Sequence, residues 1–218
     1  MTARPVSQHA AGTLEQALAM LAPPGLLVGC RRIETGDASH ILPGESATIL
    51  SRAAAARDAS GAGRWLARRL LRQLGYGDLA IPRGKAGEPL WPAGVVGSIA
   101  HDADFAIAVV APSETMRGVG VDIEPALPLP PELEPLVLNS RDRLEGCDVA
   151  IAGKIAFAVK EAAYKASFPL DGEVLGFEDI AVDLPAGTVT LSNGRRVGVG
   201  MSISSHIFAL AFVPAGVS

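Results

Sequence analysis

The stretch GVGVDIE, residues 118–124, places two carboxylates in a segment that otherwise has the composition of a buried strand. Successive side chains of a strand point to opposite faces, so its three branched apolar residues are expected on one face: Val119, Val121 and Ile123. The carboxylates of Asp122 and Glu124 then share the other face, about 6–7 Å apart along the strand. Carboxylates without nearby cysteine or histidine suit a hard cation such as Mg²⁺. The alternative is the wet face of an ordinary half-buried strand.

A third carboxylate lies on the strongest helix that the sequence predicts, residues 148–168. Asp148 is expected to cap its N-terminus, and Pro169 is expected to end it. The helical period puts these apolar residues on one buried stripe: Ile151, Ile155, Val159, Ala162 and Ala166. Glu161 and Lys165 lie one turn apart on another face, where a carboxylate could bind a cation and an ammonium could neutralise a phosphate. The alternative is a plain surface ion pair.

Two segments far apart in the chain have similar sequences. GSIA followed by FAIAVVAP, within residues 95–112, resembles MSIS followed by FALAFVP, within residues 199–214. Each is predicted to be two strands joined by a turn, the first turn being HDAD at 101–104. If the likeness is genuine, the chain consists of two related halves, and the strand at 118–124 opens the second half.

The other segments are predicted from periodicity and from turn residues. A helix at 12–22 should stop before Pro23 and Pro24, and a buried strand is expected at 26–32. Residues 43–74 favour helix, and Gly61 and Gly63 are expected to divide them into two helices. The remaining expected features are a proline- and glycine-rich loop at 81–92 and an Asn-Gly hairpin turn at 192–195.

Composition limits the classes of partner and compartment. The chain has 218 residues, of which 49% are hydrophobic, and a net charge of −4, so nothing global indicates nucleic acid or an anionic membrane. Cys30 and Cys147 are too few for a disulfide framework and are expected to be reduced thiols. The N-terminus has no secretion-signal pattern, and the apolar runs are too short to span a bilayer. A cytoplasmic protein is therefore expected.

Three segments together resemble the 4′-phosphopantetheinyl transferases, in particular the class that serves surfactin and enterobactin synthetases. They are GVGVDIE at 118–124, FAVKEAAYKA at 157–166 and GEPLWPAGVVGSIAH at 87–101. The first two match the patterns G-[VI]-D-[IV]-E and [FW]-x-x-K-E-[SA]-x-x-K-A in the usual order, with 39 residues from Asp122 to Glu161. The resemblance extends, more weakly, through residues 43–214.

The resemblance implies an α+β fold, a pseudo-dimer of two similar halves with the active site in the cleft between them. The halves are expected at residues 1–112, on the side of the coenzyme A 3′-phosphate and adenine, and 113–218, on the metal-binding and catalytic side. The implied reaction moves the phosphopantetheine arm of coenzyme A to a serine of an acyl or peptidyl carrier protein, as in secondary metabolite and siderophore synthesis. A monomer is expected.

The same resemblance implies roles for particular residues. The expected ligands of Mg²⁺, or of Mn²⁺, are Asp122, Glu124 and Glu161. Glu161 is also the expected general base for the carrier serine, and Lys165 the expected contact to the coenzyme A phosphates. Coenzyme A is further expected to contact Arg57, Arg64, Arg83, Lys85, Ala100, His101 and Asp122. Ala100 departs from the usual serine before the histidine, and Ala59-Ser60 from the usual Glu-Phe.

Other functions share some of these features. A Mg²⁺-dependent phosphoesterase acting on coenzyme A or a nucleotide would need the carboxylates but no carrier protein. A coenzyme A-binding regulatory protein would need neither a base nor a carrier, and the Glu161–Lys165 pair favours an enzyme over it. A plain α+β domain whose acidic face is only solvated would bind no coenzyme A.

Overall fold

The computed structural model describes residues 8–51 and 53–216, with side chains from Leu14 onward. The helices are α1 (Gln8–Leu21), α2 (Pro43–Ser46), α3 (Ala54–Gln73), α4 (Glu134–Val137) and α5 (Ala152–Asp171), with 3-10 turns η1 (Asp37–His40), η2 (Val149–Ile151) and η3 (Phe177–Asp179). The strands are β1 (Leu27–Arg32), β2 (Val95–His101), β3 (Phe105–Pro112), β4 (Met116–Pro125), β5 (Ile180–Asp183), β6 (Thr188–Leu191), β7 (Arg196–Ile203) and β8 (His206–Pro214). The predicted hairpin at 95–112, the strand at 118–124 and the turn at 192–195 are confirmed.

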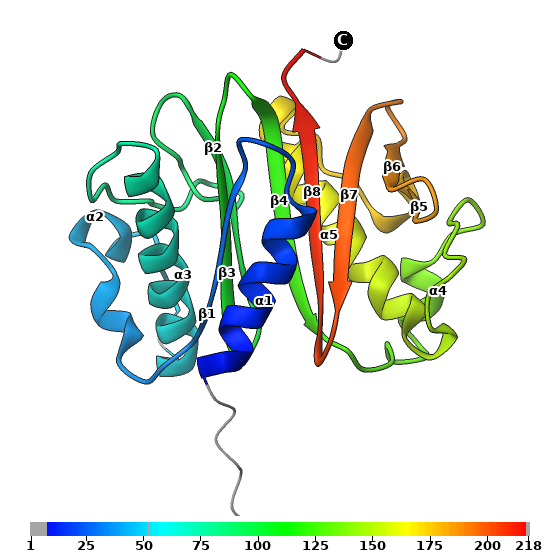
Figure 1. Ribbon diagram of the computed structural model, residues 1–218, viewed down its shortest axis with the longest axis horizontal. Helices are drawn as coiled ribbons and strands as arrows, with labels where there is room; N and C mark the ends of the chain where they lie inside the picture. The colour runs from blue at the N-terminus through cyan, green and yellow to red at the C-terminus, as the bar shows by residue number, and fades with distance from the viewer. Residues whose placement is uncertain (1–7, 52, 217–218) are drawn as a thin grey trace, which may run out of the picture.

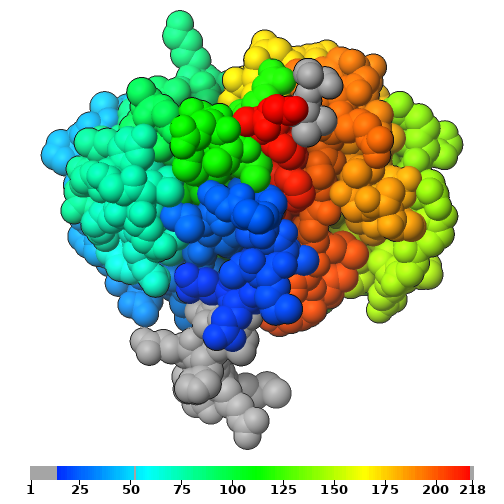
Figure 2. Space-filling model, turned by 45° about the horizontal axis from the view of Figure 1, so that its top comes forward, coloured from blue at the N-terminus to red at the C-terminus, as the bar shows by residue number. Residues whose placement is uncertain are grey.

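Two antiparallel sheets make up the centre of the molecule, one ordered β1-β3-β2 and the other β4-β8-β7-β6-β5. The helix α3 packs on the first sheet, and α5 packs on β4 and β8 of the second. In Figure 1, α5 lies behind the second sheet while α1 crosses in front, where it contacts β1 and β7. Figure 2 shows α1 in blue between the teal first part and the orange second part of the chain. The fold is therefore a mixed α/β arrangement with two sheets.

The order of elements repeats along the chain. A first strand pairs antiparallel with the second strand of a hairpin in each sheet, β1 with β3 and β4 with β8. A long helix follows the first strand in both cases, α3 and α5. The two hairpins, β2–β3 and β7–β8, are the segments whose sequences resemble each other. The second sheet differs by the additional strands β5 and β6.

One apolar core lies between α1 and the inner faces of both sheets. Its fully buried members include Leu18, Ile107, Val109, Val121, Phe208 and Leu210. Separate cores lie between α3 and the first sheet and between α5 and the second. The predicted inward face of β4 is confirmed, because Val119, Val121 and Ile123 all belong to the shared core. Separating the two sheets would therefore expose this shared apolar cluster to water.

The predicted helix break at Gly61 and Gly63 is wrong, because α3 runs unbroken through both glycines. The two helices within residues 43–74 are α2 and α3, which are separated before Ala54. A Cβ on Gly61 would lie 2.0 Å from the carbonyl oxygen of Asp37, and a Cβ on Gly63 would lie 2.6 Å from Ile99. Both positions face neighbouring segments that approach the helix closely. Glycine at these positions reflects close packing and does not mark the end of a helix.

The prediction that Pro169 ends the long helix is also wrong, because α5 continues to Asp171. Gly172 follows with φ 71°, a left-handed conformation that favours glycine, and its N–H donates to the carbonyl of Phe168. At the other end, the Asp148 side chain accepts from the Ala150 N–H and caps η2, the turn that leads into α5. Within the described residues, no helix combines the length and apolar character that crossing a membrane requires.

Candidate active site

A cavity of about 900 Å³ lies where β2 of the first sheet meets β4 of the second. The two strands are joined there by the backbone N–H of Val121, which donates to Ser98 Oγ at 3.3 Å. The loop of residues 83–91 and the helix α5 complete the walls. The charged residues in the lining include Arg83, Glu88, Arg117, Asp122, Glu161 and Lys165. Three of these were predicted as catalytic or metal-binding residues, and the fold brings them into one cavity.

Two glycines of the GVGVDIE stretch allow β4 and α5 to touch. A Cβ on Gly118 would lie 2.0 Å from the carbonyl oxygen of Ala166, and one on Gly120 would lie 1.9 Å from that of Ala162. Asp122 is the next residue on this face of the strand. The missing side chains therefore let the helix approach closely enough for Asp122 to contact Lys165.

Asp122 is buried, being only 7% exposed. Its Oδ1 accepts a hydrogen bond from Lys165 Nζ at 2.6 Å, whereas its Oδ2 is buried with no hydrogen-bond partner. Burial raises the pKa of Asp122 to about 6, against the lowering effect of the Lys165 ammonium. The negative charges of Glu124 and Glu161 raise this pKa as well, so both carboxylates lie close enough to act on Asp122.

The three predicted metal ligands are neighbours, but two of them are bound to lysines. Lys165 binds Asp122, and Lys154 Nζ donates to Glu124 Oε2 at 3.0 Å. Glu161 lines the cavity and has no hydrogen bond or ion pair within the described part of the chain. No group of three His, Cys, Asp or Glu side chains among the described residues is arranged to hold a metal ion.

The donor atoms nevertheless fit a divalent cation in their chemistry. The set contains only carboxylate oxygens, the ligands that Mg²⁺ and Mn²⁺ prefer. The unpartnered Oδ2 of Asp122 and the unpaired Glu161 carboxylate are available, whereas Glu124 would first have to release Lys154. A bound cation would also relieve the mutual repulsion that raises the pKa of Asp122.

Positive charges gather on the adjoining wall. His101 lies at the end of β2, and its pKa is lowered by burial and by the nearby charges of Arg83 and Lys165. These effects favour the neutral imidazole, which can donate a hydrogen bond to an anion without carrying a charge itself. Ala100 lines the same wall and is buried, so its backbone is the polar part available to a ligand. This wall is suited to a phosphate group.

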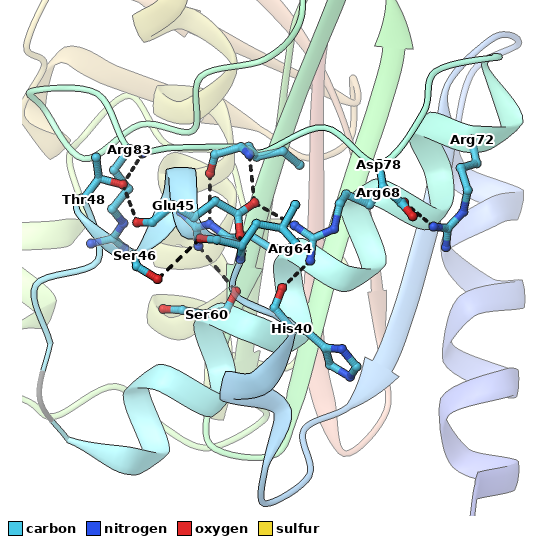
Figure 3. A network of polar contacts seen from close by, with 12 residues as sticks. His40, Glu45, Ser46, Thr48, Ser60, Arg64, Arg68, Arg72, Asp78 and Arg83 are labelled. Carbon is cyan, nitrogen blue, oxygen red and sulfur yellow. Dashed lines mark hydrogen bonds and ion pairs between the residues drawn. The ribbon is translucent and has the colours of Figure 1, made fainter.

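A buried network of hydrogen bonds and an ion pair joins α2 and α3 to the segment that precedes Arg83 (Figure 3). Glu45 is fully buried, and its Oε1 accepts from Arg68 at 2.6 Å and from the Ile81 N–H at 2.8 Å. The backbone N–H of Arg83 donates to Thr48 Oγ1 at 2.9 Å, and Arg64 donates to the carbonyls of Ile81 and Ser60. The network therefore fixes the position from which Arg83 reaches the cavity.

Three of the predicted coenzyme A contacts lie outside the cavity lining: Arg57, Arg64 and Lys85. Arg64 is 4% exposed, burial lowers its pKa, and its donors are used within the network described above. Arg57 lies half-buried in the first turns of α3, and Lys85 is exposed in the loop. Their role at the site stays a prediction.

The prediction of site residues missed Glu88, Trp91 and Arg117, which line the cavity. The indole of Trp91 lies over Gly97, where a Cβ would be only 2.6 Å away. Glu88 and Trp91 lie in the segment 87–101 that resembles the family, so the signal for them was present. Arg117 is an isolated basic residue at the start of β4, and no pattern distinguished it from a surface charge.

Lys160, the motif residue next to Glu161, lies away from the cavity. It is fully buried, and its Nζ donates to Asp142 Oδ2 at 2.8 Å and to the carbonyls of Val137 and Phe177. Burial lowers its pKa, while the Asp142 carboxylate opposes that shift. These contacts attach two segments to α5: the segment of α4 with Asp142, and the turn η3.

Parts of this chain are similar in sequence to known proteins. Residues 45–111 match the family described as the 4′-phosphopantetheinyl transferase N-terminal domain. The chain is 39% identical over 147 residues to the 4′-phosphopantetheinyl transferase Npt of Nocardia iowensis, covering 63% of this chain and 64% of the relative. It is also 39% identical over 142 residues to PptT of Mycobacterium tuberculosis, covering 63% of each. Over these parts the chain is similar to the 4′-phosphopantetheinyl transferases.

The chain is also similar to the enterobactin synthase component D of Escherichia coli, with 37% identity over 113 residues, covering 49% of this chain and 52% of the relative. The chain therefore matches less than two thirds of the length of each of these three relatives. The family match at residues 45–111 includes α3, β2 and β3, and so contains Arg83 and His101 of the cavity wall.

Proposed function

We propose that this protein transfers the 4′-phosphopantetheine arm of coenzyme A to a serine of an apo acyl or peptidyl carrier protein. The observation that supports it most is the cavity between β2 and β4, where a cluster of carboxylates faces a cationic wall. The two halves, residues 1–112 and 113–218, would form a pseudo-dimer with the active site in the cleft between them. The protein would act in the cytoplasm as a monomer.

In this reaction the serine oxygen attacks the phosphorus that bears the pantetheine arm. The bond from that phosphorus to the bridging oxygen breaks, and 3′,5′-ADP leaves with the electron pair. Glu161 faces the cavity without a partner, so its carboxylate is free to accept the serine proton. Lys165 would neutralise the phosphate oxygens, and His101 would donate a hydrogen bond to them. In-line positioning across the cavity would supply much of the remaining rate enhancement.

Asp122, Glu124 and Glu161 are the residues that would hold Mg²⁺ or Mn²⁺. A divalent cation bound there supplies charge neutralisation for the diphosphate. The Lys165 ammonium, which is bonded to Asp122 Oδ1, would turn from that carboxylate toward the phosphates of the substrate. Lys165 is 30% exposed, so such a rotation costs little burial.

The test is modification of a panel of apo carrier proteins from fatty-acid, polyketide, peptide and siderophore synthesis, with coenzyme A and Mg²⁺, followed by mass spectrometry. We expect at least one carrier to gain the mass of one phosphopantetheine group, with 3′,5′-ADP released in equal amount. Hydrolysis of coenzyme A without carrier modification would favour a phosphoesterase instead. Binding without any turnover would favour a regulatory protein, and the absence of binding would contradict all three functions.

A further inference from the structure

Glu88 is an acidic side chain on the wall of a cavity that is otherwise suited to a polyanion. Its Oε2 is buried and has no hydrogen-bond partner. No cation pairs with it within the described part of the chain. A buried carboxylate oxygen without a partner costs free energy, and in a native protein such an atom indicates a missing ligand or water.

The backbone around Glu88 is held firmly, so the side chain is placed by the fold. The Gly84 N–H donates to the Glu88 carbonyl at 2.8 Å, and the Leu90 N–H donates to the Pro82 carbonyl at 2.9 Å. The carboxylate lies over Gly84, where a Cβ would be only 2.0 Å from Glu88 Oε1. Arg83 pairs with Pro89 across this narrow hairpin.

Glu88 shares its surroundings with Tyr164. The negative charges of Glu161 and Glu88 both raise the pKa of Tyr164, and all three residues line the same cavity. Apart from Arg83, the other cavity residues of the loop carry no charge: Ala86, Gly87, Pro89, Leu90 and Trp91. A carboxylate in this position suits an uncharged N–H donor, because a phosphate would be repelled.

We propose that Glu88 accepts a hydrogen bond from an amide N–H of the pantetheine arm and so fixes the arm of coenzyme A in the cavity. This inference rests on the proposed function. The phosphates of coenzyme A belong on the wall of Arg83, His101 and Lys165. Two uncharged parts with N–H donors remain, the adenine and the arm, and the arm is the one that continues from the phosphorus attacked beside Glu161. Its two amide groups are donors of the required kind. Glu88 then distinguishes coenzyme A from nucleotides that lack the arm.

The test measures binding by isothermal titration calorimetry in the presence of Mg²⁺, with coenzyme A and with 3′,5′-ADP, which has the nucleotide but no arm. Glu88→Ala should weaken coenzyme A binding by about tenfold or more, since a hydrogen bond to a charged group is lost. Binding of 3′,5′-ADP should stay within about twofold of wild type. Glu88→Gln keeps a carbonyl acceptor and should retain most of the affinity for coenzyme A. Glu114→Ala, an exposed site in the turn after β3, is the matched control.

Each other outcome is decisive. Unchanged or tighter binding of coenzyme A to Glu88→Ala would overturn the inference, because the carboxylate would then only repel the substrate. Equal weakening of both ligands would also overturn it, and would assign Glu88 to the adenine or to the fold. If wild type binds neither ligand, the proposed function itself fails. The unfolding temperature of Glu88→Ala should equal or exceed that of wild type, because an unpartnered buried carboxylate is removed.

Discussion

The buried carboxylate between α2 and α3 and the carboxylates that face the cavity differ in how completely they are hydrogen-bonded. Behind α3, Glu45 accepts from Arg68 and from two backbone N–H groups, so its buried carboxylate is fully used. In the cavity, Asp122 and Glu88 each have a buried oxygen with no hydrogen-bond partner among the described residues. Both regions contain buried carboxylates, and they differ in whether the oxygens of those carboxylates have partners. The carboxylate beside α3 serves the fold, whereas those of the cavity have acceptors available to a ligand.

The second half has its own counterpart of the Glu45–Arg68 pair. Lys160 on α5 pairs with Asp142, which also accepts from the backbone N–H groups of Asn139 and Val182. Arg68 on α3 and Lys160 on α5 are thus both buried cations that pair with a carboxylate of a connecting segment. This contrast predicts that substitutions behind the helices reduce stability, whereas substitutions in the cavity reduce activity.

The largest expected effect is on transfer in the cavity variants Asp122→Ala and Glu161→Ala. Each should lower the rate of carrier modification by about 1,000-fold or more, because the site loses a cation ligand and, for Glu161, the base. The free energy of unfolding in the absence of Mg²⁺ should not fall, since Asp122 is only partly satisfied and Glu161 has no partner. Rates from mass spectrometry and urea unfolding curves measure the two properties. Full transfer activity in either variant would remove the metal assignment.

Breaking the buried pairs should give the opposite result. Arg68→Met leaves Glu45 buried without its cation and should lower the free energy of unfolding by about 3 kcal/mol or more. Lys160→Met should cost a similar amount, because Asp142 and two carbonyls lose their donor. Arg143→Met is the control, because its ion pair with Asp183 is exposed and should contribute less than about 1 kcal/mol. Equal effects for all three variants would show that burial of the pairs does not matter.

The glycines at helix contacts test packing in both halves. Gly61→Ala and Gly120→Ala would each bring a Cβ within 2.0 Å of a backbone carbonyl oxygen, of Asp37 and Ala162 respectively. Such overpacking should destabilise each variant by about 2 kcal/mol. Gly77→Ala, where a Cβ meets no atom within 4 Å, should change stability by less than about 0.5 kcal/mol. Thermal unfolding of the three variants measures this, and a neutral Gly61→Ala would show that η1 can move away from α3.

The sequence predicted helices and strands best where the spacing of apolar residues and the turn residues indicate the same element. The hairpin at 95–112 and the inward face of β4 follow from alternation, and both are confirmed. Gly61, Gly63 and Pro169 were taken as helix breakers, and the structure shows unbroken helices at all three. The reason is tertiary: a glycine at a contact with a neighbouring segment looks the same in sequence as a glycine at a helix end. The structure shows that Gly61 is a contact glycine, because the Asp37 carbonyl lies against it.

The sequence predicted which residues gather at the site, but it did not predict which of them form hydrogen bonds or ion pairs with one another. Asp122, Glu161, Lys165, Arg83 and His101 were expected together, and the cavity brings them together. The bond between Lys154 and Glu124 could not be predicted, because it depends on how α5 crosses β4. The same holds for Arg64, which looks like a surface charge in sequence but is buried against the Ile81 carbonyl. Glu88 lies in the family-like segment 87–101, but nothing in the sequence shows that its carboxylate has an oxygen without a hydrogen-bond partner.

The smallest effect concerns pH and tests the cavity charges directly. Burial raises the pKa of the Asp122 carboxyl to about 6 from its ordinary value of 3.8, so the folded protein binds this proton more tightly than the unfolded chain does. Stability should therefore rise as pH falls from 7 to 5, by about 1 kcal/mol from this group. Urea unfolding of wild type in EDTA, with Asp122→Asn as the reference, isolates that contribution. A difference between the two proteins that does not change with pH would show that Asp122 is ionised as freely in the cavity as in water. Saturating Mg²⁺ should abolish the rise, because a bound cation favours the carboxylate over the acid.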